Sequence, residues 1–333
     1  MDKTITKQNL LTKLILVATV FSILVIALGA YTRLVHAGLG CPDWPLCYGH
    51  LWAPDSSSEV AQANLKYPQA QVDLDKTWPE MTHRYLASSL GLLCIAILWL
   101  SIQVRKTHPD FPVKHASGLL AFIILQGLFG MWTVTLKLWP QVVTLHLLGG
   151  FATFCLLLLL YLRVRKVPID FVSSNSGRMV ARLSLVIVVI QVMLGGWLTS
   201  NYAAMACIEL PFCPIGQLNA QDFAQGFNFL QQIGPNYLGG QLDGGARIAI
   251  HAMHRYGALV CVIVLILLVG ILVRSRYWLL AIPLALLTVI QVGLGVANVY
   301  YSLPLFNAVA HNVTGAILVG CLVWVNYHLN RVK

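Results

Sequence analysis

Four histidines recur at matched positions in the two halves of the sequence and could hold metal. They are His83, His146, His254 and His311. The first and third each begin the triplet His-Arg-Tyr, and the other two each follow a glutamine by twenty residues. Two imidazoles that face each other across a helical bundle can bind a haem iron from both sides. A single such histidine could equally be solvated at a helix end. Two matched pairs favour haem, and no third ligand stands at zinc spacing.

A carboxylate stands three residues before the first of these histidines. Glu80 and His83 would share one face of a helix, and Pro79 suits the first turn of that helix. In the other half, His251 takes the place of Glu80. A carboxylate there could simply favour a helix N-terminus, or it could stabilise positive charge or accept a proton at a reacting porphyrin edge. The asymmetry predicts that one haem reacts and the other carries electrons.

Further polar residues accompany the candidate ligands. Arg84 and Arg255 directly follow the first and third histidines. Each could pair with a haem propionate or extend to the lipid headgroups. His251 leaves open which histidine is the ligand in the second half, and the alignment of the two halves favours His254. His36 is expected on the same side and could guide a substrate.

Four cysteines form two Cys-x5-Cys motifs, Cys41–Cys47 and Cys207–Cys213. Prolines bend both intervals and can bring the paired Cα atoms within disulfide range, and the compartment outside a bacterial inner membrane is oxidising. We therefore expect two loop disulfides, which either hold a loop over a haem edge or exchange electrons. The other cysteines are expected to be small hydrophobic residues within helices, namely Cys94, Cys155, Cys261 and Cys321.

The elements that must position these residues are membrane-spanning helices. Of the 333 residues, 58% are hydrophobic and 10% are charged, whereas soluble domains carry about 25% charge. Eight apolar runs are near the roughly 20 residues that cross a bilayer, namely Leu14–Leu34, Ser88–Val104, Leu119–Leu138, Val142–Leu162, Leu183–Leu198, Ile248–Val273, Trp278–Val299 and Val309–Tyr327. We predict an all-α membrane protein with eight transmembrane helices, the first too long for a cleaved signal peptide. The two long outer loops are expected at about residues 36–80 and 203–246.

The distribution of charge predicts the orientation of the chain. The net charge is +10, but Lys and Arg form no single patch, which argues against nucleic acid as a partner. With the N-terminus inside, 15 of the 22 Lys and Arg residues lie on the inner side. The positive-inside rule then places both termini in the cytoplasm. On this topology all four histidines fall in the first turns of their helices, near the outer boundary of the membrane.

Sequence features recur after about 166 residues. The two cysteine motifs are 166 residues apart, the His-Arg-Tyr triplets 171, and the other two histidines 165. We interpret the chain as two tandem four-helix bundles, residues 1–170 and residues 171–333. Each unit has an even number of spans, so the copies share one orientation and are predicted to be pseudo-symmetric about an axis along the membrane normal.

Taken together, these motifs resemble the haem A synthase family. The resemblance rests on Gly-Ala-Tyr31-Thr32-Arg33-Leu-Val before the Cys41–Cys47 pair, Glu80-x-x-His83-Arg84, His146, the second cysteine pair, His254-Arg255 and His311. It covers essentially the whole chain. Members that lack cysteines in one or both loops differ from this sequence in that respect.

The resemblance implies an activity and two haem sites. In this family the C8 methyl group of haem O is hydroxylated in two steps and water is lost, which leaves the formyl group of haem A for terminal oxidases. By this resemblance His83 and His146 would hold the substrate haem in the first unit. His254 and His311 would ligate a haem b in the second unit, through which electrons leave.

The resemblance also implies roles for the outer residues and a set of partners. Glu80 matches the family's essential glutamate, and Cys41 and Cys47 match a pair proposed to act near the substrate. Cys207–Cys213 would be the structural counterpart. The expected location is a bacterial inner (plasma) membrane. The expected partners are membrane lipid, a haem O synthase, an electron acceptor such as a quinone, and a second copy of the chain.

Two other classes of protein fit parts of the pattern. A bis-histidine b-type cytochrome could carry electrons between a quinone and an outer partner, although the exchange of Glu80 for His251 argues against it. A quinone-linked thiol oxidase could use the paired outer cysteines for disulfide exchange. The nature of the haem that the protein holds would separate these classes from an enzyme that modifies haem.

Overall fold

The protein is helical throughout the part of the chain that the structure describes. This computed structural model describes residues 3–165 and 175–330. The long helices are α1 (Lys3–Leu34), α3 (Leu74–Arg105), α4 (Val113–Thr135), α5 (Pro140–Arg165), α6 (Asn175–Ser200), α8 (Gly244–Arg274), α9 (Trp278–Tyr300) and α10 (Leu305–Leu329). The short helices α2 (Ser57–Lys66), η1 (Ile215–Gln217) and α7 (Ala220–Gly226) lie in the two long loops. Among the described residues, eight helices are long and apolar enough to cross a membrane, which confirms the prediction.

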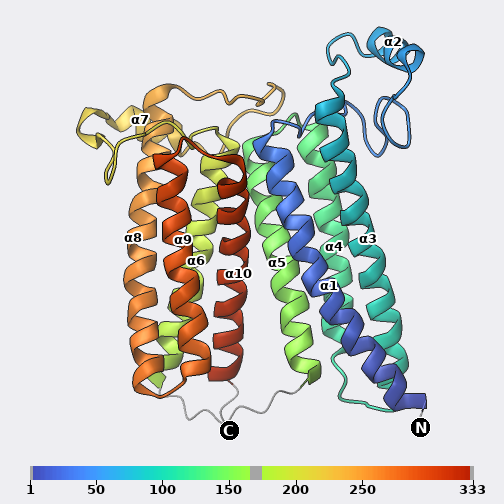
Figure 1. Ribbon diagram of the computed structural model, residues 1–333, viewed down its shortest axis with the longest axis vertical. Coiled ribbons are helices and arrows are strands. Elements are labelled where there is room, and N and C mark those ends of the chain that lie inside the picture. Colours follow the sequence, from blue (N-terminus) through green and yellow to red (C-terminus); the bar gives the residue numbers. More distant parts are fainter. Residues whose placement is uncertain (1–2, 166–174, 331–333) are drawn as a thin grey trace.

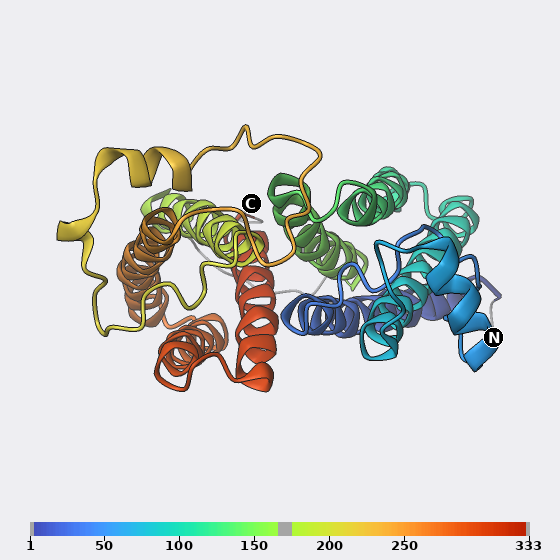
Figure 2. The same ribbon diagram turned by 90° about the horizontal axis from the view of Figure 1, so that it is seen from above.

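The eight long helices pack as two four-helix bundles (Figures 1 and 2). In the first bundle, α1 and α4 each contact α3 and α5, and in the second, α6 and α9 each contact α8 and α10. Helices α3 and α5 therefore face each other across the first bundle, as α8 and α10 do across the second. The bundles meet where α10 contacts α1 and α5 and where α5 contacts α6. The predicted boundary between residues 170 and 171 lies outside the described residues.

Helix α3 begins well before the apolar run that predicts it. It starts at Leu74 rather than near Ser88, and the Asp73 side chain caps its first turn. The prediction that the histidines lie in first turns is therefore wrong. His83 is the tenth residue of α3, Pro79 also lies inside this helix, and the other three histidines lie at least one turn inside α5, α8 and α10. Apolar runs mark the lipid-facing length of a helix, whereas the first turns of α3 are buried against the first long loop.

Backbone conformations recur at the offsets found in the sequence. Non-glycine residues with a positive φ pair as His36 with Tyr202, Lys137 with Ser302, and Leu138 with Leu303. The cis peptide bonds before Pro45 and Pro211 have the same relation. This recurrence fits a duplicated chain, and the pseudo-symmetry of the two bundles stays a prediction.

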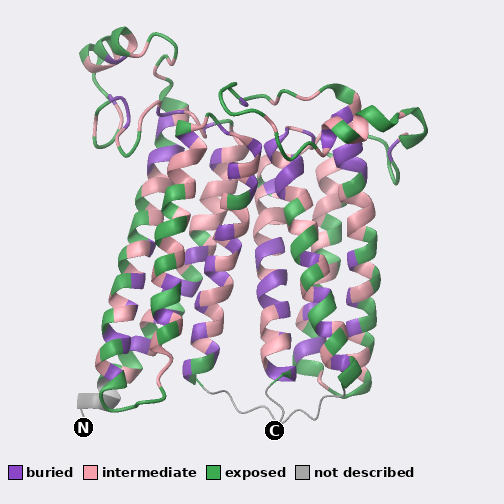
Figure 3. Ribbon diagram, turned by 180° about the vertical axis from the view of Figure 1, so that it is seen from behind, coloured by how far each residue is buried: buried purple, intermediate pink, exposed green. Residues whose placement is uncertain are grey.

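Large apolar side chains face outward along both bundles. Figure 3 shows exposed positions on the outer sides of the helices, and Ile124 is 60% exposed while Val289 is 71% exposed. Apolar faces of this length are unfavourable in water, whereas hydrocarbon tails cover them without cost and helices satisfy their own backbone groups. The chain is a multi-pass membrane protein.

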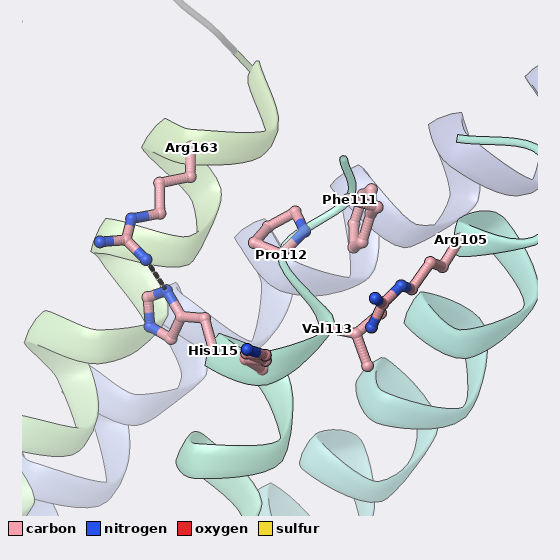
Figure 4. A pocket seen from close by; sticks show the side chains of 7 residues that line it. Arg105, Phe111, Pro112, Val113, His115 and Arg163 are labelled. Carbon is pink, nitrogen blue, oxygen red and sulfur yellow. Dashed lines mark hydrogen bonds between the residues drawn. The ribbon is translucent and has the colours of Figure 1, made fainter. Parts of the chain in front are cut away.

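The two ends of the molecule differ in chemistry. Helix α1 begins and α10 ends at one end, the terminal end, and the two long loops lie at the other, the loop end (Figure 1). A cavity of about 240 Å³ lies at the terminal end, where α3 ends, α4 begins and α5 ends (Figure 4). Its lining is Arg105, Phe111, Pro112, Val113, Lys114, His115 and Arg163. Basic side chains at this end agree with the predicted inner side, and the orientation stays a prediction.

The contact between the bundles gives a prediction on stability. A Cβ atom on Gly320 of α10 would lie 2.5 Å from Cε1 of Phe154, a buried residue of α5. Gly320→Ala should therefore overpack the contact and cost about 1–3 kcal/mol, seen as a lower midpoint of thermal unfolding in detergent micelles.

Gly270→Ala is the matched control. A Cβ atom on Gly270 of α8 meets no atom within 4 Å, so this variant should gain up to about 1 kcal/mol from the higher helix propensity of alanine. Equal midpoints for the two variants would contradict the packing described here.

Candidate functional site

The first histidine pair meets across the first bundle. His83 belongs to α3 and His146 to α5, the two helices that face each other. The centroids of the two rings are 6.4 Å apart, and the ring planes cross at 86°. His254 and His311 occupy the corresponding helices of the second bundle, α8 and α10.

Each of the four rings lies against a glycine on a neighbouring helix. A Cβ atom on that glycine would lie between 2.8 and 3.2 Å from the Cε1 atom of the ring. The pairs are Gly29 with His83, Gly130 with His146, Gly195 with His254, and Gly295 with His311. A larger residue at any of these glycines would push the ring out of its place. The glycines lie on α1, α4, α6 and α9, so every helix that carries a histidine is lined by one that carries a glycine.

The arrangement of the first pair fits an iron atom between two imidazoles. A metal to imidazole bond of about 2 Å on each side separates two opposed nitrogens by about 4 Å, and the ring centroids lie slightly further out. The observed separation of 6.4 Å therefore accommodates one iron and leaves no room for an intervening side chain. Within the described residues, no group of three or more His, Cys, Asp or Glu side chains converges. The donors come as pairs, as axial haem ligation requires.

Glu80 links α3 to the first long loop. The residue is 4% exposed. Its Oε1 atom accepts a hydrogen bond from Arg84 Nη2 at 2.5 Å, and its Oε2 atom accepts one from the backbone amide of Cys41 at 2.9 Å. Arg84 also donates to the Leu46 carbonyl at 2.8 Å. Both side chains therefore hold the loop on the helix, one turn from His83.

Both predicted disulfides are confirmed. Cys41 is bonded to Cys47 with the Cα atoms 4.8 Å apart, and Cys207 to Cys213 with the Cα atoms 5.8 Å apart. The first pair is fully buried and packs with Met81 of α3. The disulfide therefore fixes the loop segment whose amide group contacts Glu80.

The second long loop is held without a carboxylate. Arg255 donates to the carbonyl groups of Cys207 at 2.6 Å, Pro211 at 3.5 Å, and Glu209. His251 is 4% exposed, and its Nδ1 atom lies 3.1 Å from the Ala203 carbonyl oxygen. His251 thus contacts the loop, whereas His254 contacts Gly195 on the neighbouring helix. Arg84 and Arg255, for which the sequence leaves a haem propionate or lipid headgroups as partners, make these loop contacts.

Arg33 crosses from the first bundle to the second. Its Nη2 atom donates to the carbonyl of Thr199, at the end of α6, at 2.5 Å, and its guanidinium lies 3.9 Å from the ring centroid of Tyr202. The His36 ring stacks on the same Tyr202 with centroids 5.5 Å apart. Burial and the positive charges of Arg33 and Lys76 lower the pKa of His36, so its ring is neutral at pH 7.

Three of the four rings also contact a glutamine. Gln126 and Gln291, which mark the repeat in the sequence, lie against His146 and His311. Gln191 lies against His254. The sequence comparison missed Gln191, Gly29 and Gly130 as site residues, because their side chains or lack of them matter only through a neighbouring helix.

The fold and the two histidine pairs define a class of protein. It is a multi-pass membrane protein of paired four-helix bundles, with histidines arranged as axial haem ligands between facing helices. Residues 12–323 match the COX15-CtaA family, described as cytochrome oxidase assembly protein. The chain belongs to this family.

Curated relatives extend over almost the whole chain. Haem A synthase of Shewanella oneidensis is 44% identical over 324 residues, which cover 96% of each chain. Haem A synthase of Erythrobacter litoralis is 27% identical and covers 93% of this chain and 94% of its own. Haem A synthase of Sphingopyxis alaskensis is 25% identical and covers 93% of this chain and 89% of its own.

The contacts of the two arginines give a prediction on stability. Arg84→Met removes the charged partner of Glu80 and leaves a buried carboxylate unpaired, which should cost about 3–5 kcal/mol. Arg255→Met removes the corresponding arginine but leaves no buried carboxylate, so the loss should be about 1–3 kcal/mol. Denaturant titration of both variants in detergent micelles measures the difference.

A double variant tests the cause of this difference. Glu80→Gln combined with Arg84→Met removes the unpaired charge and should recover part of the stability lost in Arg84→Met. Equal losses in the two single variants, or no recovery in the double variant, would show that Glu80 and Arg84 are not a buried ion pair.

Proposed function

We propose that the chain is an oxidoreductase that converts haem O to haem A by oxidising the C8 methyl group to a formyl group. Family membership and the 44% identical haem A synthase support this activity. The observation that carries it is the pair of rings of His83 and His146, 6.4 Å apart, with the Glu80 carboxylate one turn earlier on α3. Neither an electron carrier nor a thiol oxidase gains support from these relatives.

The two bundles have different roles in this proposal. The first bundle binds the substrate haem through His83 and His146, and the second binds a haem b through His254 and His311. Bound haem b would supply a one-electron centre that takes electrons from the reaction. The carboxylate distinguishes the bundles, because the second one has His251, a neutral loop contact, at the position of Glu80.

Glu80 is the residue that we assign to the reaction itself. A buried carboxylate at the N-terminal side of a histidine ligand can stabilise positive charge on the substrate or accept a proton released from the oxidised methyl group. Arg84 and the Cys41 amide hold both carboxylate oxygens, so the group is fixed before substrate binds. The Cys41–Cys47 disulfide supports the reaction by fixing that amide.

The surroundings of the reaction follow from the same proposal. Both termini lie in the cytoplasm, so that the histidine pairs lie toward the outer face of a bacterial inner membrane. A haem O synthase supplies the substrate, a quinone accepts the electrons, and the apolar outer faces contact lipid or a second copy of the chain.

Pigment analysis tests the activity. Membranes that contain the protein together with a haem O synthase should yield haem A on extraction, identified by mass. Haem O without haem A would overturn the proposal.

Glu80→Gln tests the assigned residue. The amide can still accept a hydrogen bond from Cys41, so the fold and the haem b content should be retained. Haem A formation should fall by at least about 100-fold, because general acid or base catalysis contributes about 10²–10⁴-fold. Glu59→Gln changes an exposed carboxylate in the same loop and should leave haem A formation unchanged. Wild-type output from Glu80→Gln would reject the role.

A further inference from the structure

One histidine of the four differs from the others in its contacts. The amide nitrogens of Gln126 and Gln191 lie 3.1 Å from Nδ1 of His146 and His254, and they donate to the backbone carbonyls of the same histidines at 2.6 and 2.8 Å. These glutamines therefore hold both the ring and the backbone of a histidine.

The remaining two rings differ from each other. The amide nitrogen of Gln291 lies 3.3 Å from Nε2 of His311. No glutamine contacts His83. Its Nδ1 atom is buried without a hydrogen-bond partner, although the backbone carbonyl of Val25 interacts with the ring.

The missing glutamine can be located on α1. Gln191 stands 166 residues after Val25, the offset that relates Gly29 to Gly195 beside the same two rings. Val25 is thus the counterpart of Gln191, and an apolar side chain stands where the second bundle has an amide. The ring of His83 has packing on this side and no side-chain hydrogen bond.

A second position has changed together with the first. A Cβ atom on Gly257 of α8 would collide with Oε1 of Gln191, so the glutamine needs this glycine. The counterpart of Gly257 at the 171-residue offset of α3 and α8 is Leu86. A glutamine at position 25 would therefore meet a leucine. The Gln191–Gly257 pair and the Val25–Leu86 pair are two self-consistent packings of the same contact.

The polar pair is suited to holding a metal-bound imidazole. A histidine that ligates a metal usually donates its other ring N–H to a partner, which fixes the ring, and loss of that partner costs about 10–100-fold in affinity. Oε1 of Gln191 is buried without a hydrogen-bond partner, and a glutamine amide can either donate or accept. It could accept from Nδ1–H of His254 once Nε2 holds iron.

We propose that these two pairs decide which haem stays and which leaves. Gln191 and Gly257 fix His254 and make the haem of the second bundle resident. Val25 and Leu86 leave His83 as the weaker of the two ligands in the first bundle, so the haem there exchanges through it. This inference rests on the proposed function, in which a substrate haem must enter the first bundle and a product haem must leave it.

The test follows haem loss from the purified full-length protein, made together with a haem O synthase. Excess apomyoglobin captures released haem, and mass analysis of the haem left behind separates haem O and haem A from haem b. In the wild type, haem O and haem A should leave faster than haem b. The double variant Gln191→Val/Gly257→Leu should lose haem b about 10–100-fold faster, and Val25→Gln/Leu86→Gly should lose haem O and haem A more slowly by a similar factor.

Single variants keep the test valid if a double variant does not fold. Gln191→Leu removes the amide without filling the space at Gly257 and should also speed the loss of haem b. Gln191→Glu retains an acceptor and should restore slow loss, together with the wild-type low-spin electron paramagnetic resonance signal that Gln191→Leu shifts. Restoration by glutamate would exclude a purely steric effect.

The outcomes separate this inference from the proposed function. Wild-type rates of haem loss in the Gln191 and Val25 variants, with both haems bound, would overturn the inference and leave the function intact. A protein that never contains haem O or haem A would overturn the proposed function instead.

Discussion

Each imidazole ring lies between two helices because the neighbouring helix has no side chain at the point of contact. This constraint sets the separation of the helices that carry the histidines and directs each ring toward the bundle axis. The facing helices α3 and α5 can then bring two rings to 6.4 Å. The remaining helices, α1 and α4, serve as walls, and their glycines are part of the site although they supply no ligand.

The loop end adds chemistry to this scaffold through one buried ion pair. Glu80 and Arg84 stabilise each other and hold the disulfide loop, so the carboxylate costs less to bury than an isolated charge would. The second bundle achieves the same docking with Arg255 and backbone carbonyls alone. The carboxylate is therefore not needed to hold a loop, which strengthens its assignment to the reaction.

Much of this organisation could be predicted from the sequence. Hydropathy predicts all eight spans, the spacing of the cysteines predicts both disulfides, and the internal offsets predict the four histidines on corresponding helices. These features are visible because each is carried by residue type along one segment. The early start of α3 at Leu74 could not be read from apolar runs, because its first turns are buried by a polar loop rather than by lipid.

Contacts between helices were harder to predict. The sequence offers propionate or lipid as partners for Arg84, and only the folded loop brings the Leu46 carbonyl within reach. Gln191 has no matching residue in the other half, so the repeat comparison that identified Gln126 and Gln291 could not identify it. A search for differences between the halves, which drew attention to Glu80, would also have found Gln191 opposite Val25.

The bond from Arg33 to Thr199 joins two positions that are 166 residues apart and correspond in the repeat. A residue touches its own counterpart only beside a twofold axis. Two separate, identical copies of such a unit would bring two arginines together there, and their like charges would oppose association. Joining the copies in one gene allows threonine on one side, so the covalent link between the halves permits a contact that a symmetric homodimer could not make.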